Sequence, residues 1–184
     1  MRNSVNASNA AHSAHDTFRA RCARALRHVR TTAAAGRRAF PPATLKAIEQ
    51  AIGAGEQAHT AEVRLILEPE LDLGEVLRGT SNRQRALALF AEYGVWDTEE
   101  NCGVLIYVNL AERQVDIVAD RNVGRRIGPE QWQAICASMT TGFAAGDYHD
   151  STLRAIGALN DLLRQYFPAN GARPNQLPDQ AIVL

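Results

Sequence analysis

The sequence predicts an α/β fold in which helices cover both faces of a small mixed β-sheet. Val104–Val108 is a continuous apolar run, which is typical of a strand that is buried on both faces. Val115, Ile117 and Ala119 share one face of a second strand by period-two alternation, and the polar residues 109–112 form a turn between the two strands. Apolar residues at helical spacing precede and follow this hairpin, and they predict the helices.

A helix, a strand and a second helix are expected before the hairpin. The first helix begins at Pro41, because proline suits a first helical turn. The alternating residues 61–68 predict the strand, and residues 69–81, which open with a proline, predict a loop. Asn82 is the expected cap of the second helix, and Gly94 is placed to end it.

Two helices are expected after the hairpin. Gly128 and Pro129 open the first, whose apolar residues step by three and four. Asp150 or Ser151 caps the second, and Pro168 closes it. The order is then α-β-α-β-β-α-α. The first two strands are expected to be parallel through a right-handed crossover, and the third runs antiparallel to them.

We expect three parts in the chain, and its formal net charge of zero hides a basic first part. Residues 1–40 hold eight arginines and one acid, Asp16, and we interpret them as a basic, partly disordered extension. Residues 41–168 form the expected α/β domain, and residues 169–184 are expected to be a loose tail. The charge of the whole chain therefore favours neither nucleic acid nor membrane as a partner.

Composition favours a soluble cytoplasmic protein. Cys22, Cys102 and Cys136 are widely spaced and form no CxxC pair, which favours reduced thiols over a disulfide framework or a zinc site. No apolar run approaches the ~20 residues of a transmembrane segment. The basic N-terminus allows a weak peripheral contact with anionic membranes. Trp96 and Trp132 lack the interleaved basic residues of a nucleic-acid platform.

Four segments in order resemble the TPM domain family: TAEVRLIL at Thr60–Leu67, VWDTEENCGVLIYV at Val95–Val108, VDIVADRNV at Val115–Val123, and WQAICASMTTGFAAGDY at Trp132–Tyr148. The resemblance covers about residues 41–168 and is strongest to soluble bacterial members, which lack the family's common membrane anchor. It implies an α/β sandwich and divalent-cation binding, often calcium. It also implies a module that binds a cation or a protein partner, with a metal-assisted acid phosphatase as the alternative.

The predicted topology brings polar residues to one end of the sheet. The amino ends of the two parallel strands and the carboxyl end of the third strand lie at the same edge. Ca²⁺ and Mg²⁺ prefer carboxylate, carbonyl and water oxygens. The candidate metal ligands at this edge are Glu62, Asp97, Glu100, Asn101 and Asp120, and Arg121 is the candidate contact for a phosphate or a partner. The alternative is that these residues are solvated loop acids, with Arg121 paired to Asp120.

One departure from the family pattern lowers the expected metal affinity. Many members have Asp-Asn-Gly before the central strand, whereas this chain has Asn101, Cys102 and Gly103. An amide replaces a carboxylate there, and the number of charged ligands sets calcium affinity. No GxSxG, CxxC or phosphate-loop motif supplies a catalytic residue. His59 and His149 have no partner at metal-ligand spacing, so surface or capping roles are expected for them.

Overall fold

The computed structural model describes residues 23–24, 26, 33–171 and 174–184. Its sheet has four strands in the order β3-β2-β1-β4. Their bounds are β1 (Glu62–Glu68), β2 (Gly103–Asn109), β3 (Gln114–Ala119) and β4 (Ile182–Val183). Strand β1 is parallel to β2 and to β4, and β3 is antiparallel to β2. The predicted mixed sheet and its central hairpin are confirmed.

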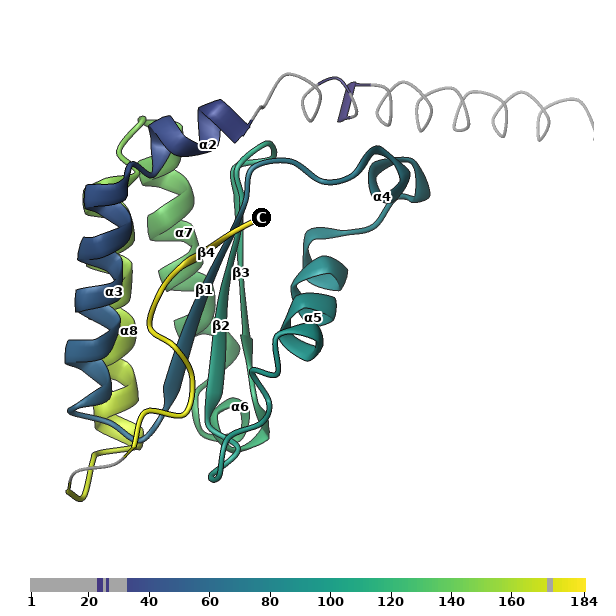
Figure 1. Cartoon of the computed structure of the whole chain (residues 1–184). Helices are drawn as coiled ribbons and strands as arrows, with labels where there is room; N and C mark the ends of the chain where they lie inside the picture. The colour runs from purple at the N-terminus through teal and green to yellow at the C-terminus, as the bar shows by residue number, and fades with distance from the viewer. Residues whose placement is uncertain (1–22, 25, 27–32, 172–173) are drawn as a thin grey trace, which may run out of the picture.

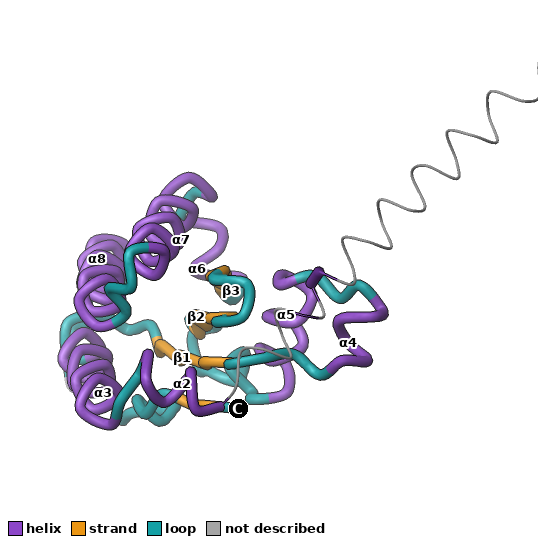
Figure 2. The backbone as a smooth tube through the Cα atoms, turned by 90° about the horizontal axis from the view of Figure 1, so that it is seen from above, coloured by secondary structure: helices purple, strands orange, loops and turns teal. Residues whose placement is uncertain are grey.

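Helices lie on both faces of this sheet, as Figures 1 and 2 show. On one face lie α3 (Pro42–Glu56), α7 (Pro129–Ala144) and α8 (His149–Tyr166), and on the other lies α5 (Asn82–Glu92). Three shorter helices are α2 (Ala33–Ala39), α4 (Leu73–Arg78) and α6 (Arg121–Arg126).

The two faces of the sheet build two separate apolar clusters. Alternate residues of β1 and β2, such as Leu65 and Ile106, pack toward α3, α7 and α8. The residues between them, such as Ile66 and Leu105, pack toward α5. All seven residues of β2 are buried, as its continuous apolar run predicts. Full burial of one such Leu or Ile side chain contributes about 1.5–3 kcal/mol, so β2 anchors both layers.

The helix boundaries agree with the sequence except at two caps. Ser81, not Asn82, caps α5, because its hydroxyl accepts from Gln84 N–H while the Gln84 side chain accepts from Ser81 N–H. Helix α8 begins at His149, which precedes both predicted caps. There Asp147 Oδ1 accepts from Asp150 N–H at 3.1 Å, so Asp147 performs the expected role of Asp150 or Ser151.

Two segments that were predicted to be irregular, 69–81 and the tail, contain regular structure, and α6 is a helix that was not predicted from the sequence. Helix α4 lies within the expected loop 69–81, where Asp72 caps its start and Gly79, with a φ of 78°, ends it. Helix α6 follows β3 directly. The tail from residue 174 was expected to be loose, but β4 pairs with β1 and Leu184 N–H donates to Leu67 O at 3.0 Å.

Regular structure begins before residue 41. Helix α2 lies within the predicted basic extension, and Phe40 is 2% exposed in the core. Residues 1–22, the larger part of that extension, lie outside the described residues. No helix among the described residues combines the length and apolar character that crossing a membrane needs.

Candidate functional site

The amino end of β2 lies against the carboxyl end of β3, which brings Glu100, Asn101 and Asp120 close together. Asp120 N–H donates to Gly103 O at 2.9 Å, and Asn122 N–H donates to Asn101 O at 3.3 Å. The Asn122 side chain also donates from Nδ2 to Glu100 O at 3.0 Å. The backbone of the loop before β2 is therefore fixed to the start of α6, beside Asp120.

Asp120 caps α6 with one carboxylate oxygen and leaves the other unsatisfied. Oδ1 accepts from Arg121 N–H at 2.7 Å. Oδ2 is buried and has no hydrogen-bond partner among the described residues, and the whole residue is only 8% exposed. A buried acceptor without a partner costs ~1–3 kcal/mol, and more when it is charged. A cation or a bound water would remove that cost, so the residue fits a ligand site.

Glu62 and Asp120 lie opposite each other on either side of Gly103 in the sheet, but the carboxylate of Glu62 is bound by the tail. Its Oε2 accepts from the backbone N–H groups of Gln176 at 3.2 Å and Leu177 at 3.0 Å. Gly103 pairs with Glu62 on one side and accepts from Asp120 N–H on the other. A Cβ on Gly103 would lie 1.7 Å from Val95 O, so that carbonyl lies directly against Gly103.

The remaining predicted residues are exposed at this end of the sheet. Asp97 N–H donates to Gly94 O at 2.9 Å, which places Asp97 in the turn after α5. The side chain of Arg121 is exposed where α6 begins. No group of three or more His, Cys, Asp or Glu side chains within residues 33–171 and 174–184 is placed to hold a metal ion. A cation at Asp120 would therefore need Asn101, backbone carbonyls and water as further ligands.

A pocket that the sequence did not predict lies beside Glu62, between the end of α3 and the tail. Its volume is about 590 Å³, and Glu56, His59, Glu62 and Asp179 are among its lining residues. Burial raises the pKa of Glu56 to about 9, and the nearby charges of Glu62 and Asp179 act in the same direction. Glu56 lies four residues after Ile52, on the buried stripe of α3. An acid at such a position is the signal in the sequence that could have indicated the pocket.

His59 differs from its prediction as a surface residue. It is 1% exposed, its Nδ1 lies 3.0 Å from Ala61 O, and its Nε2 lies 3.3 Å from Asn160 Oδ1. Burial lowers its pKa, which favours the neutral imidazole. Cys102 is buried, and burial raises the pKa of its thiol, which makes it a poor nucleophile.

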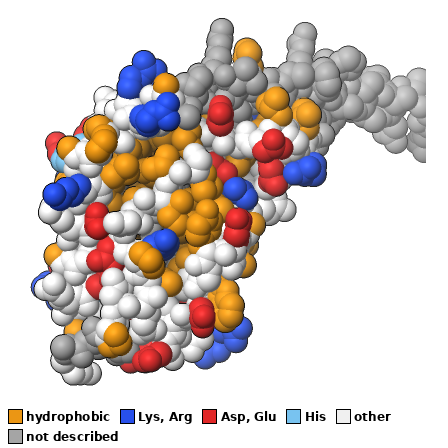
Figure 3. All heavy atoms as spheres, in the orientation of Figure 1, with side chains coloured by type: hydrophobic (Ala, Val, Ile, Leu, Met, Phe, Trp, Pro, Cys, Tyr) orange, Lys and Arg blue, Asp and Glu red, His pale blue; other side chains and the backbone are white. Residues whose placement is uncertain are grey.

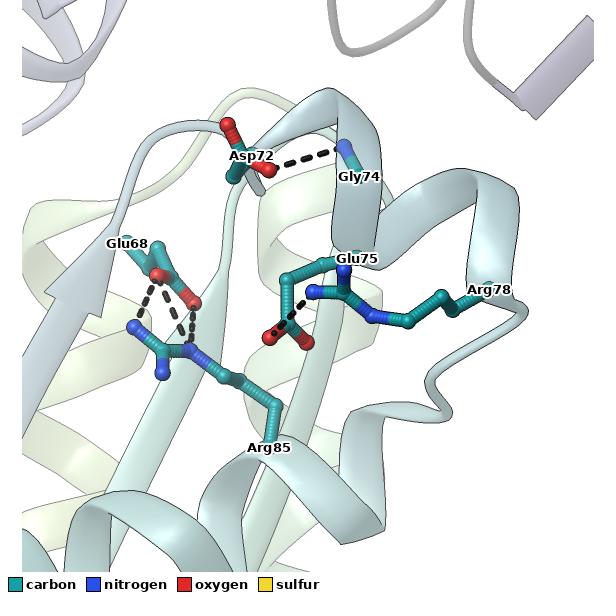
Figure 4. Close-up of polar contacts among 6 residues, drawn as sticks. All are labelled: Glu68, Asp72, Gly74, Glu75, Arg78 and Arg85. Atoms are coloured by element: carbon teal, nitrogen blue, oxygen red, sulfur yellow. Dashed lines mark hydrogen bonds and ion pairs between the residues drawn. The ribbon is translucent and has the colours of Figure 1, made fainter.

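The opposite end of the sheet carries a second polar group, shown in part in Figure 4. Glu68 accepts from Arg85 Nη2 at 2.7 Å and from the Tyr107 hydroxyl at 2.5 Å. Glu75 and Arg78 of α4 pair beside it at 3.2 Å. Arg85 and Glu68 join α5 to the carboxyl end of β1, whereas the pair of Glu75 and Arg78 lies within α4.

Residues 36–162 match the model of the TPM domain. The chain belongs to the TPM domain family. The NMR structure of the BA42 protein from the psychrophilic bacterium Bizionia argentinensis is similar, with a TM-score of 0.69 over 78% of this chain and 94% of that one. The two sequences are 22% identical, so this likeness shows the fold of the TPM domain and nothing finer. No curated protein matches the chain.

Proposed function

We propose that this TPM domain binds a divalent cation, Ca²⁺ or Mg²⁺, beside Asp120. The observation that carries the proposal is the buried Oδ2 of Asp120, which lacks a partner among the described residues. Asn101 and the backbone of Glu100 lie on the loop that Asn122 fixes beside Asp120, and amide and carbonyl oxygens are ligands of the kind that both ions prefer. Asp97 lies on the same loop and adds negative charge to the approach.

The expected affinity is low because few carboxylates reach the site. Glu62 is held by the tail, and position 101 is a neutral amide. Sites with little ligand charge bind calcium with a dissociation constant of about 10⁻⁴–10⁻³ M. A cation in contact with Asp120 would stabilise the fold by about 1.4 kcal/mol when its free concentration is about ten times that constant.

The test combines calorimetric titration of Ca²⁺ and Mg²⁺ with thermal unfolding of the native chain in EDTA and in millimolar metal. Asp120→Asn keeps an oxygen that can accept from Arg121 N–H, so it should preserve the fold and abolish both the binding heat and the thermal shift. Glu130→Gln, which removes an exposed acid from α7, is the matched control and should change neither. No binding heat and no shift in the native chain would refute the proposal.

A metal-assisted phosphatase is the second candidate. Metal-assisted phosphoryl transfer needs an open coordination position and a positive group for the phosphate. Arg121, which directly follows Asp120 and is exposed, supplies that group. Metal-dependent hydrolysis of a generic phosphomonoester, lost in Arg121→Gln with metal binding retained, would support the enzyme. Metal binding without hydrolysis would support a module that binds the cation alone or together with a protein partner.

A further inference from the structure

Helix α4 presents an apolar face that no described residue covers. Leu73 is 47% exposed and Leu77 is 60% exposed, and they lie one turn apart on the same side of the helix. Val76, which lies between them in the sequence, is buried. Figure 3 shows hydrophobic side chains beside acidic and basic ones at the upper right, where α4 lies. Adjacent exposed leucines on one helix face favour an interaction surface over isolated exposed side chains.

The rim of this face carries a net negative charge. Glu70 and Asp72 are exposed before and at the start of α4. Glu75 lies within the helix, where its charge is offset by Arg78 at 3.2 Å. The preferred occupant is therefore a segment that combines apolar and basic side chains. An anionic bilayer fits such a rim poorly.

The chain itself contains a segment with apolar and basic side chains. The contacts of Arg24, which follows that segment, place it beside α4. Arg24 donates from Nη2 to Thr80 O at 2.7 Å, two residues beyond the end of α4, and it also pairs with Glu112. Both partners in this ion pair are mostly buried, with side-chain exposures of 16% and 10%. Arg24 therefore holds the chain beside the carboxyl end of α4.

The residues before Arg24 can reach the whole face. An extended chain advances about 3.5 Å per residue, so a residue six positions earlier lies within about 20 Å. Helix α4 has six residues and is about 9 Å long. Phe18, Arg19 and Arg21 provide an apolar ring and two positive charges within that distance.

From these contacts we infer that the exposed face of α4 is the docking surface for the chain's own N-terminal segment, residues 1–22. Leu73 and Leu77 provide the apolar contact, and Glu70 and Asp72 attract the arginines. Arg24 fixes the point at which the segment meets the domain. This inference does not depend on the proposed cation site, which lies at the opposite end of the sheet.

The first test is the rate at which trypsin cuts the full chain after Arg19 and Arg21. Docking should slow this cleavage in the native chain about tenfold relative to Leu73→Ser/Leu77→Ser, a factor equal to 1.4 kcal/mol of docking free energy. Glu70→Lys should accelerate it as well. Trp96→Ser is the matched control, because Trp96 is 54% exposed at the other end of the sheet, and it should leave the rate unchanged. Equal rates in the native chain and the double leucine variant would overturn the inference.

The second test uses the native thiol of Cys22 to find which segment occupies the face of α4. A short bis-maleimide should link Cys22 to the thiol introduced by Leu77→Cys within one chain, and not to the thiol introduced by Trp96→Cys. Links formed only between two chains would assign the surface to a second copy and overturn docking within the chain. Sedimentation of the native chain with anionic phosphatidylglycerol vesicles, lost in Leu73→Ser/Leu77→Ser, would assign the surface to a membrane and overturn it too.

Discussion

The hydroxyl of Tyr107 donates a 2.5 Å hydrogen bond to Oε2 of Glu68, and both side chains are buried. Burial and this bond raise the pKa of Tyr107, so the phenol remains a proton donor. Arg85 binds the same carboxylate through Nε and Nη2. The three side chains join β1, β2 and α5 at one point.

Tyr107→Phe should destabilise the fold by about 1.5–3 kcal/mol, because a buried carboxylate loses a hydrogen-bond donor. Urea unfolding measures this loss as a lower midpoint with an unchanged slope. Tyr166→Phe removes the hydroxyl of a half-buried tyrosine at the end of α8 and should cost less than about 0.5 kcal/mol. Equal losses in the two variants would show that the bond to Glu68 contributes nothing specific.

Glu56 should make stability decrease as the pH rises. Its pKa is raised from 4.5 to about 9 in the fold, by burial first and then by Glu62 and Asp179. Between these two values the folded state retains a proton that the unfolded state releases. The contribution of protonated Glu56 to the free energy of unfolding is therefore complete below about pH 4.5 and is lost as the pH rises through about 9.

Glu56→Gln should remove this dependence and stabilise the fold near neutral pH. The amide oxygen can still accept the 2.7 Å hydrogen bond from Val63 N–H. We expect a gain on the order of 1–3 kcal/mol at about pH 8 and almost none near pH 5. Urea unfolding of both proteins across this range checks the prediction, and parallel curves would contradict it.

Gly103→Ala should be among the most damaging single substitutions in β2. The added Cβ would lie 1.7 Å from Val95 O, which is backbone and cannot rotate away. A loss of at least ~3 kcal/mol, or failure to fold, is expected from overpacking of this size. Gly157→Ala in α8 is the matched control, because nothing lies within 4 Å of its added Cβ. That variant should gain about 0.5–1 kcal/mol, as measured by thermal unfolding.

The sequence was sufficient to predict the parts of the fold that have a strong apolar period. The run at 104–108 and the alternation at 115–119 predicted β2 and β3, and the crossover rule predicted their directions relative to β1. Helix α4 was missed because its six residues are too few to show a helical period. Strand β4 has only two residues and no pattern of its own.

Topology also predicted that Glu100, Asn101 and Asp120 would lie at one end of the sheet, and the backbone contacts of Asn122 and Gly103 place the loop before β2 beside the start of α6. Whether they bind a cation stays a prediction. The contacts of Glu62 could not be predicted, because its partners are backbone N–H groups of the tail and no side chain marks them. The half-buried pair of Glu56 and Asp179 was missed because Asp179 lies on the tail, although the position of Glu56 on the buried stripe of α3 is a signal in the sequence.

The pairing of β4 with β1 implies that one edge of the sheet can open without global unfolding. The strand contributes two residues, and its partner in β1 lies far earlier in the chain, so closing that long loop costs entropy and gains few hydrogen bonds. Amide hydrogens of the tail should therefore exchange with solvent through a low-energy partial opening, while those of β2 exchange only through complete unfolding. Each such opening would briefly present the backbone of β1, from Ile66 to Leu67, as an unpaired strand.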